Sequence, residues 1–158
     1  MKPASLAQLK KELKHKSGDE LEALVLRLTK HKTENKELLT YLLFEADDEA
    51  GFIAHIKEDI DHLFEEVNTN TMYFIKKGIR KILRTLKRYI RYSQNKETEV
   101  ELLLYFCTKM AAFRPSVKEN QAMVYVFEKQ KEMIAKKIVS LHEDLQYDYS
   151  LELKQITL

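Results

Sequence analysis

The chain has 158 residues, of which 44% are hydrophobic and 33% charged, and its formal net charge is +2. This length fits one domain with a core of its own, and the near-neutral charge excludes a generally basic surface while allowing a local basic patch. Three Gly and two Pro are too few for a turn-rich β-fold, and the only cysteine, Cys107, excludes an intrachain disulfide and a zinc cluster of several thiolates. We therefore expect a single all-α domain over residues 1–158.

Three short helices are predicted within residues 1–46, because leucines recur there at spacings of three and four. The first runs from about Ser5 to His15. Ser17 followed by Glu20 is a capping box that predicts the start of the second, and Thr33 can cap the third. The faces expected to point inward are Leu6, Leu9 and Leu13, then Leu21, Leu24, Val25 and Leu28, then Leu38, Leu39, Leu42 and Leu43.

Four longer helices are predicted within residues 48–146, at about 48–67, 71–92, 96–113 and 117–145. A second capping box, Ser116 with Glu119, predicts the start of the last one. The helix at 96–113 is apolar over more than half of its circumference, so we expect it to be central. Short connections favour antiparallel neighbours, which predicts about seven helices in an antiparallel helical bundle or a short irregular α-solenoid. A regular solenoid is less favoured, because the sequence has no fixed-period repeat.

The C-terminal segment, residues 147–158, alternates apolar and polar side chains, which is the period of a strand. No other segment offers it a partner strand, so the favoured interpretation is a helix end followed by an extended tail that is frayed or docked. The alternative is strand pairing with a second subunit or another protein. For that alternative the partner-binding candidates are Tyr147, Tyr149, Leu151 and Leu153.

Opposite charges are concentrated on two consecutive segments. Residues 45–66 contain nine acids and one lysine, whereas residues 67–95 contain no acid and eight cations. On a helical wheel the eight cations form one stripe, opposite a packing face rich in isoleucine and leucine. The stripe consists of Lys76, Lys77, Arg80, Lys81, Arg84, Lys87, Arg88 and Arg91.

Three uses of this cationic stripe are open. The favoured interpretation is a solvated face balanced by acids of neighbouring helices. On the preceding helix, the acids able to balance it are Glu58, Asp59, Asp61, Glu65 and Glu66. The second use is binding the phosphate backbone of a nucleic acid, because lysine and arginine neutralise phosphates and release counterions. The third is contact with a membrane surface or an acidic protein.

One constellation is compatible with a metal site. His55, Asp59, His62 and Glu66 are spaced i, i+4, i+7 and i+11, so they share one face of the predicted helix 48–67. Imidazole and carboxylate ligands at such spacing occur in metal-binding helical bundles, but those sites also need ligands from a facing helix, and no second matching set is present. The favoured interpretation is a hydrated polar face. The chain also lacks a glycine-rich phosphate loop and a recognisable nucleophile, so we expect no enzyme activity and no cofactor.

The N-terminal segment carries a family resemblance. Leu9-Lys10-Lys11-Glu12-Leu13-Lys14, Asp19-Glu20-Leu21-Glu22-Ala23-Leu24-Val25-Leu26-Arg27-Leu28 and Lys36-Glu37-Leu38-Leu39-Thr40-Tyr41-Leu42 resemble the start of an uncharacterised bacterial all-α family, a domain of unknown function. The resemblance covers about the first 45 residues, implies an all-α cytoplasmic protein and carries over no site. The same segment is more distantly similar to the helix–loop–helix of SAP nucleic-acid-binding modules. The glycine-containing loop is shorter and altered here, so no binding residue is transferred.

These patterns predict a non-enzymatic helical interaction or scaffold protein that binds a protein partner or a second copy of itself. It would use exposed helix faces or the segment 147–158. Nucleic-acid binding through the cationic stripe is the alternative, and a metal-binding helical bundle is the third possibility. The first eight residues contain no apolar signal region and no apolar run is long enough for a transmembrane segment, so we expect the protein to be cytoplasmic.

Overall fold

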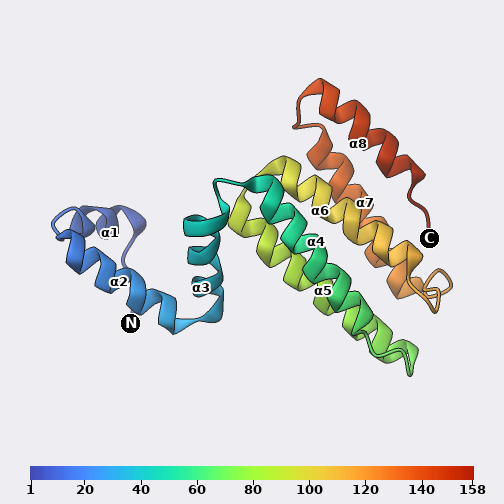
Figure 1. Cartoon of the computed structure of the whole chain (residues 1–158), viewed down its shortest axis with the longest axis horizontal. Coiled ribbons are helices and arrows are strands. Elements are labelled where there is room, and N and C mark those ends of the chain that lie inside the picture. Colours follow the sequence, from blue (N-terminus) through green and yellow to red (C-terminus); the bar gives the residue numbers. More distant parts are fainter. The chain divides into compact units, whose positions relative to one another are not determined.

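The structure is a computed structural model that describes all 158 residues, and it confirms the all-α prediction (Figure 1). It contains eight α-helices, one more than the predicted seven, and no strand. In chain order the elements are α1 (Leu6–Leu13), α2 (Gly18–His31), α3 (Thr33–Thr40), the π-helical turn η1 (Tyr41–Glu45), α4 (Glu49–Glu65), α5 (Met72–Ser93), α6 (Lys96–Ala112), α7 (Gln121–Ile138) and α8 (Glu143–Gln155).

The chain falls into two compact units where the sequence predicted a single domain. The N-terminal unit is Met1–Phe44, and the C-terminal unit is Glu45–Leu158. The division lies close to the boundary predicted between the three short helices and the four longer ones.

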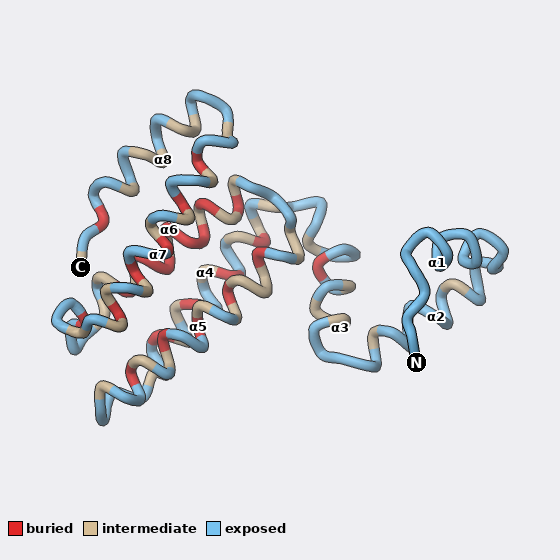
Figure 2. Tube along the Cα trace, turned by 180° about the vertical axis from the view of Figure 1, so that it is seen from behind, coloured by how far each residue is buried: buried red, intermediate tan, exposed pale blue.

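The helices of the N-terminal unit bury almost nothing. Two of them are capped by a side chain, whereas α3 begins after Lys32 without one, so the predicted cap at Thr33 is wrong. Ser5 and Ser17 each form a capping box at the start of α1 and α2, and the box at Ser17 is the predicted one. Nevertheless, no residue of α1, α2 or α3 is buried, and Figure 2 shows these helices exposed or half-buried throughout. The unit thus has well-defined helices but only one buried residue, Tyr41 of η1.

The core of the molecule belongs to the C-terminal unit and is centred on α6, as predicted. This helix packs against α4, α5, α7 and α8. Its buried residues include Phe106 and Cys107, both with no exposed surface, and the Phe106 ring lies 5.8 Å from that of Phe64. Burial raises the pKa of the Cys107 thiol to about 12, so this cysteine is an inert packing residue.

The C-terminal end of the chain corrects two predictions. The predicted helix 117–145 is interrupted: α7 begins after the N-cap Asn120 rather than after Ser116, and His142 caps a separate helix, α8. The segment 147–158 is therefore helical up to Gln155, and only residues 156–158 form the predicted non-helical end, which is docked through the buried Ile156. Its alternating pattern also fits a helix, because residues four apart share a helical face.

Polar contacts join α4 to α6. Lys57 donates to Glu101 at 2.7 Å, while Asp61 accepts from the Tyr105 hydroxyl at 2.6 Å and from the Lys109 ammonium at 2.8 Å. Burial alone would raise the pKa of Asp61, but the bonds from Lys109 and Tyr105 outweigh it and hold the pKa below its usual value. The carboxylate therefore binds α6 in its charged form.

Replacing Asp61 with Asn is expected to make folding stability less dependent on acid pH. Because the pKa of Asp61 is lower in the folded state, its contribution is present above the unfolded value of 3.8 and is lost as the pH falls through the folded value. The stability difference between wild type and Asp61→Asn, measured by urea unfolding, should be at most about 1 kcal/mol near pH 7 and should shrink near pH 3. A difference independent of pH would show that the charge of Asp61 contributes nothing.

At Gly78 the backbone of α5 lies close to Val67, which follows α4. Gly78 lies inside α5, where glycine costs about 1 kcal/mol relative to alanine. A Cβ at this position would lie only 3.0 Å from Cγ1 of Val67. The missing side chain lets Val67 pack directly on the α5 backbone.

Candidate nucleic-acid interface

One face of α5 packs in the core and the other carries its cations, as the wheel predicted. The buried side consists of Ile75, Ile79, Ile82, Leu86 and Ile90. Of the eight cations, Lys77, Arg80, Lys81, Arg84 and Arg91 are exposed, while Lys76, Lys87 and Arg88 are half-buried. We call these eight residues the cationic face.

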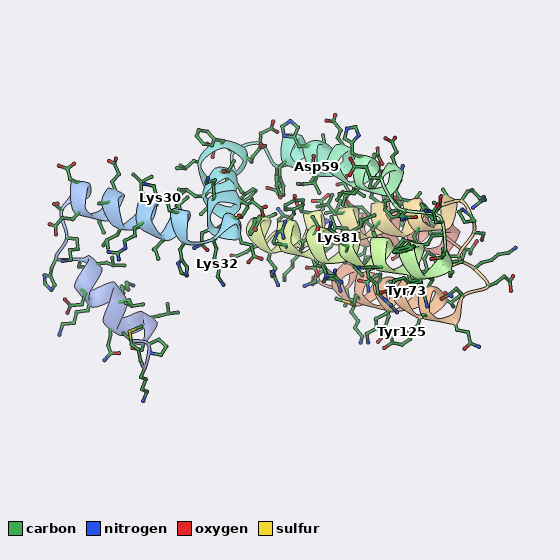
Figure 3. All side chains as sticks on the ribbon, turned by 90° about the horizontal axis from the view of Figure 1, so that it is seen from below. Lys30, Lys32, Asp59, Tyr73, Lys81 and Tyr125 are labelled. Carbon is green, nitrogen blue, oxygen red and sulfur yellow. The ribbon has the colours of Figure 1, made fainter.

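The cationic face is not balanced by the acids that the sequence suggested. None of Glu58, Asp59, Asp61, Glu65 and Glu66 forms an ion pair with a cation of α5; Asp61 pairs with Lys109 of α6, and Glu65 with His62. Seven of the eight cations, all except Arg88, make no ion pair with any acid. Figure 3 shows Asp59 and Lys81 on different sides of the bundle. The predicted ion pairs with these acids of α4 are therefore absent, whereas the five exposed cations agree with the solvated part of the favoured interpretation.

A surface hollow lies at the N-terminal end of the cationic face. It has a volume of about 420 Å³ and is lined by Tyr73, Lys76, Lys77, Arg80 and Arg84. Tyr73 is 63% exposed, and its ring meets that of Phe74 in an edge-to-face contact with the centroids 5.4 Å apart. An aromatic ring thus stands among four cations.

A second hollow, of about 570 Å³, lies at the C-terminal end of the cationic face. It adds Lys96 and Lys137, from α6 and α7, to Lys87 and Arg91 of α5. Its one acid, Glu99, pairs with Lys137 at 3.1 Å. The Lys87 ammonium lies 3.8 Å from the sulfur of Met133, and burial lowers its pKa. Positive charge therefore extends from one hollow to the other along the whole of α5.

Sequence reasoning missed part of this surface. Lys96 and Lys137 are distant from the basic run in sequence, so only the packing of α6 and α7 brings them to it. Tyr73 had a detectable signal, because it precedes Lys76 and Lys77 by three and four residues and so shares their side of a helix.

The metal candidates on α4 do not converge. His55 contacts Glu45 at 3.3 Å and His62 contacts Glu65 at 3.7 Å, and both histidine side chains are mostly exposed. Asp59 and Glu66 are exposed on the same helix. Nowhere in the chain do three or more His, Cys, Asp or Glu side chains gather in an arrangement able to hold a metal ion.

The C-terminal partner-binding candidates point in two directions. Tyr149 donates to Glu97 at 3.0 Å and, like Leu153, is half-buried on the inner side of α8. Tyr147 and Leu151 lie on its outer side, 68% and 43% exposed. The backbone of this segment bonds within α8, so it does not offer a free strand edge.

A second candidate surface lies within the N-terminal unit. An apolar groove of about 580 Å³ runs along α1 and the start of α2. Its lining consists of Leu6, Leu9, Leu13 and Leu21, with the stems of Lys10 and Lys14 beside them. Both α1 and α2 were predicted to turn these leucines inward, but the structure leaves Leu6 84% exposed and Leu9 47% exposed.

Comparison of the chain with family models, with curated proteins and with solved structures finds no match. The resemblance to an uncharacterised bacterial all-α family thus stays a prediction. None of the helices combines the length and the apolar character that crossing a membrane requires.

Proposed function

We propose that this chain is a non-enzymatic binding protein whose cationic face on α5 binds the phosphate backbone of a nucleic acid. The observation that carries the proposal is that seven of the eight cations form no ion pair with an acid. From the sequence, a protein scaffold was the first expectation and nucleic-acid binding the second. We reverse this order, because phosphate can bind only cations that acids of the protein do not cover.

Electrostatic repulsion within α5 supports the proposal. Lys77 and Lys81, and likewise Arg80 and Arg84, are like charges four residues apart, and each such pair costs an isolated helix about 0.2–0.5 kcal/mol. A phosphate polyanion removes this repulsion and gains entropy from released counterions. The arginines add planar guanidinium groups that bind phosphate oxygens in pairs.

The same geometry argues against a membrane surface as the partner. An interfacial helix must insert its apolar face among lipids. On α5 that face is the buried set containing Ile79 and Leu86, neither of which has exposed surface. Inserting it would require unfolding of the C-terminal core.

Salt dependence of binding tests the proposal. If the five exposed cations neutralise phosphates, log K for a labelled single strand should fall against log salt with a slope of about −3.5, a loss of roughly 100-fold between about 50 and 200 mM. Absence of saturable binding at 50 mM would contradict the proposal. Vesicles rich in phosphatidylserine, used as competitor, should not displace the oligonucleotide.

A second function, protein docking, is favoured by the N-terminal unit. Eleven large hydrophobic side chains of residues 6–44 are exposed, and three of them, Leu6, Leu9 and Leu13, line one apolar groove, which is typical of an interaction site. The groove along α1 is flanked by Lys10 and Lys14, and the unit holds nine basic and six acidic residues. We propose that it accepts an acidic amphipathic helix of a partner protein, whose leucines would fill the groove and whose carboxylates would face the lysines.

Replacing Leu9 and Leu13 with Asp is expected to abolish this docking, because the groove would lose apolar area and gain repulsive charge. The measurement is fluorescence anisotropy with a labelled peptide of about 20 residues that repeats leucine at helical spacing among glutamates. A peptide with lysines in place of the glutamates is the control and should bind at least tenfold more weakly. Equal affinity for both peptides would contradict an acidic partner, and concentration-dependent dimerisation in ultracentrifugation would instead assign the groove to a second copy.

A further inference from the structure

We infer that the nucleic acid is single-stranded and that one of its bases stacks on Tyr73 while its backbone follows the cationic face towards Arg91. This inference rests on the proposed function and names its substrate class. It concerns the hollow at the N-terminal end of α5, which no feature of phosphate binding alone explains.

Tyr73 has the properties of a stacking platform. Its ring is 63% exposed, its hydroxyl has no hydrogen-bond partner in the protein, and the edge-to-face contact with Phe74 holds it in place. Thr71 caps the helix just before it by accepting from the backbone N–H of Phe74. The ring therefore projects from the ordered first turn of α5 rather than from a loop.

The hollow brings the aromatic ring and the cations to one place. Its volume of about 420 Å³ is within the range of small-molecule sites, which begins at about 300 Å³. Within its lining, Lys77, Arg80 and Arg84 follow one another along the helix in steps of three and four residues, which space their side chains about 5–6 Å apart. A base on Tyr73 would thus place the following phosphates beside successive cations.

A duplex fits this arrangement less well than a single strand. The faces of its bases are already stacked, so an exposed tyrosine gains nothing from them, whereas every unpaired base offers a free π-face. The cations also form one row along one helix, which suits one sugar-phosphate backbone. Figure 3 shows Tyr73 and Lys81 on the same side of the bundle, where such a strand would lie.

The first test replaces Tyr73 with Ala and with Phe. Loss of base stacking should weaken binding of a labelled oligothymidine about 5- to 100-fold in Tyr73→Ala, whereas Tyr73→Phe, which keeps the ring, should bind like the wild type. The matched control is Tyr147→Ala, because Tyr147 is 68% exposed on α8 and should not contact the strand. Affinity for a hairpin duplex of the same length should be unchanged in all variants.

The second test reports stacking directly. The chain contains no tryptophan, so Tyr73→Trp introduces a single indole fluorophore at the hollow. Oligothymidine should quench its emission, whereas inorganic polyphosphate of matched charge should bind the cationic face without quenching it.

The outcomes separate this inference from the proposal beneath it. Unchanged oligothymidine binding by Tyr73→Ala, equal loss for single strand and duplex, or polyphosphate binding as tight as oligothymidine would each overturn the stacking inference while leaving phosphate binding intact. No binding of any polyanion at low salt would overturn both.

Discussion

Reversing two charges on α5, in the double variant Arg80→Glu/Arg84→Glu, is expected to reduce affinity for single-stranded nucleic acid at least 100-fold. Each arginine loses a charge-assisted contact with phosphate, for which about 1.5 kcal/mol is a lower estimate, and two such losses correspond to roughly 100-fold. Repulsion between the new glutamates and the phosphates increases the effect. Both arginines are exposed and unpaired, so the fold should be unaffected.

The matched control is Lys136→Glu/Lys154→Glu, which changes the net charge by the same amount at exposed positions near the ends of α7 and α8. It should retain most of the wild-type affinity, because neither lysine lines a hollow at the cationic face. Circular dichroism establishes that both double variants stay helical. An equal loss of affinity in the two would mean that net charge, and not the cationic face, governs binding.

The second large effect concerns stability. Phe106→Ala is expected to lower the free energy of unfolding of the C-terminal unit by about 3–5 kcal/mol, the usual cost of emptying a fully buried phenylalanine site. Phe106 has no exposed surface and its ring packs against Phe64, so neighbouring side chains can fill the cavity only in part.

Urea unfolding followed by tyrosine fluorescence measures this effect, because seven of the eight tyrosines lie in Glu45–Leu158. The midpoint should fall with little change in the slope. Val139→Ala is the control: Val139 is 74% exposed, so its truncation should cost less than about 0.5 kcal/mol. A cost below about 1 kcal/mol for Phe106→Ala would contradict a core centred on α6.

Local patterns predicted much of this fold. The capping box at Ser17 marked the start of α2, and the apolar surface of residues 96–113 identified α6 as central. The two-sided character of α5 was also evident, because a helical period fixes which residues share a face. These predictions succeeded because they depend on neighbours within one helix.

The failures depend on how helices pack together. Whether Asp61 turns towards α5 or α6 depends on the rotation of α4, which the sequence pattern leaves open; in the structure it turns towards Lys109. Tyr149 and Leu153 lie on one face of α8 and Tyr147 on the other. The apolar residues at every second position therefore gave the same sequence pattern as a strand. Likewise, the leucine spacing in α1 predicted an apolar face but could not indicate whether the chain itself would cover it.

The candidate interface depends both on patterns within one helix and on packing between helices. Its central cations were identified from their spacing, and Tyr73 adjoins them in sequence. The hollow at the C-terminal end could not be predicted, because Lys96 and Lys137 reach it from two other helices. Only the structure therefore shows a positively charged surface that continues beyond α5.

The most direct test of the central claim is the salt dependence of oligonucleotide binding in Arg80→Gln/Arg84→Gln, compared with wild type and with Lys136→Gln/Lys154→Gln. Removing two phosphate contacts should make the slope of log K against log salt shallower by about 1.4, at roughly 0.7 per contact for a single strand. The control variant should keep the wild-type slope. If Arg80→Gln/Arg84→Gln also keeps it, the phosphates contact another part of the protein, and the cationic face of α5 is not the binding site.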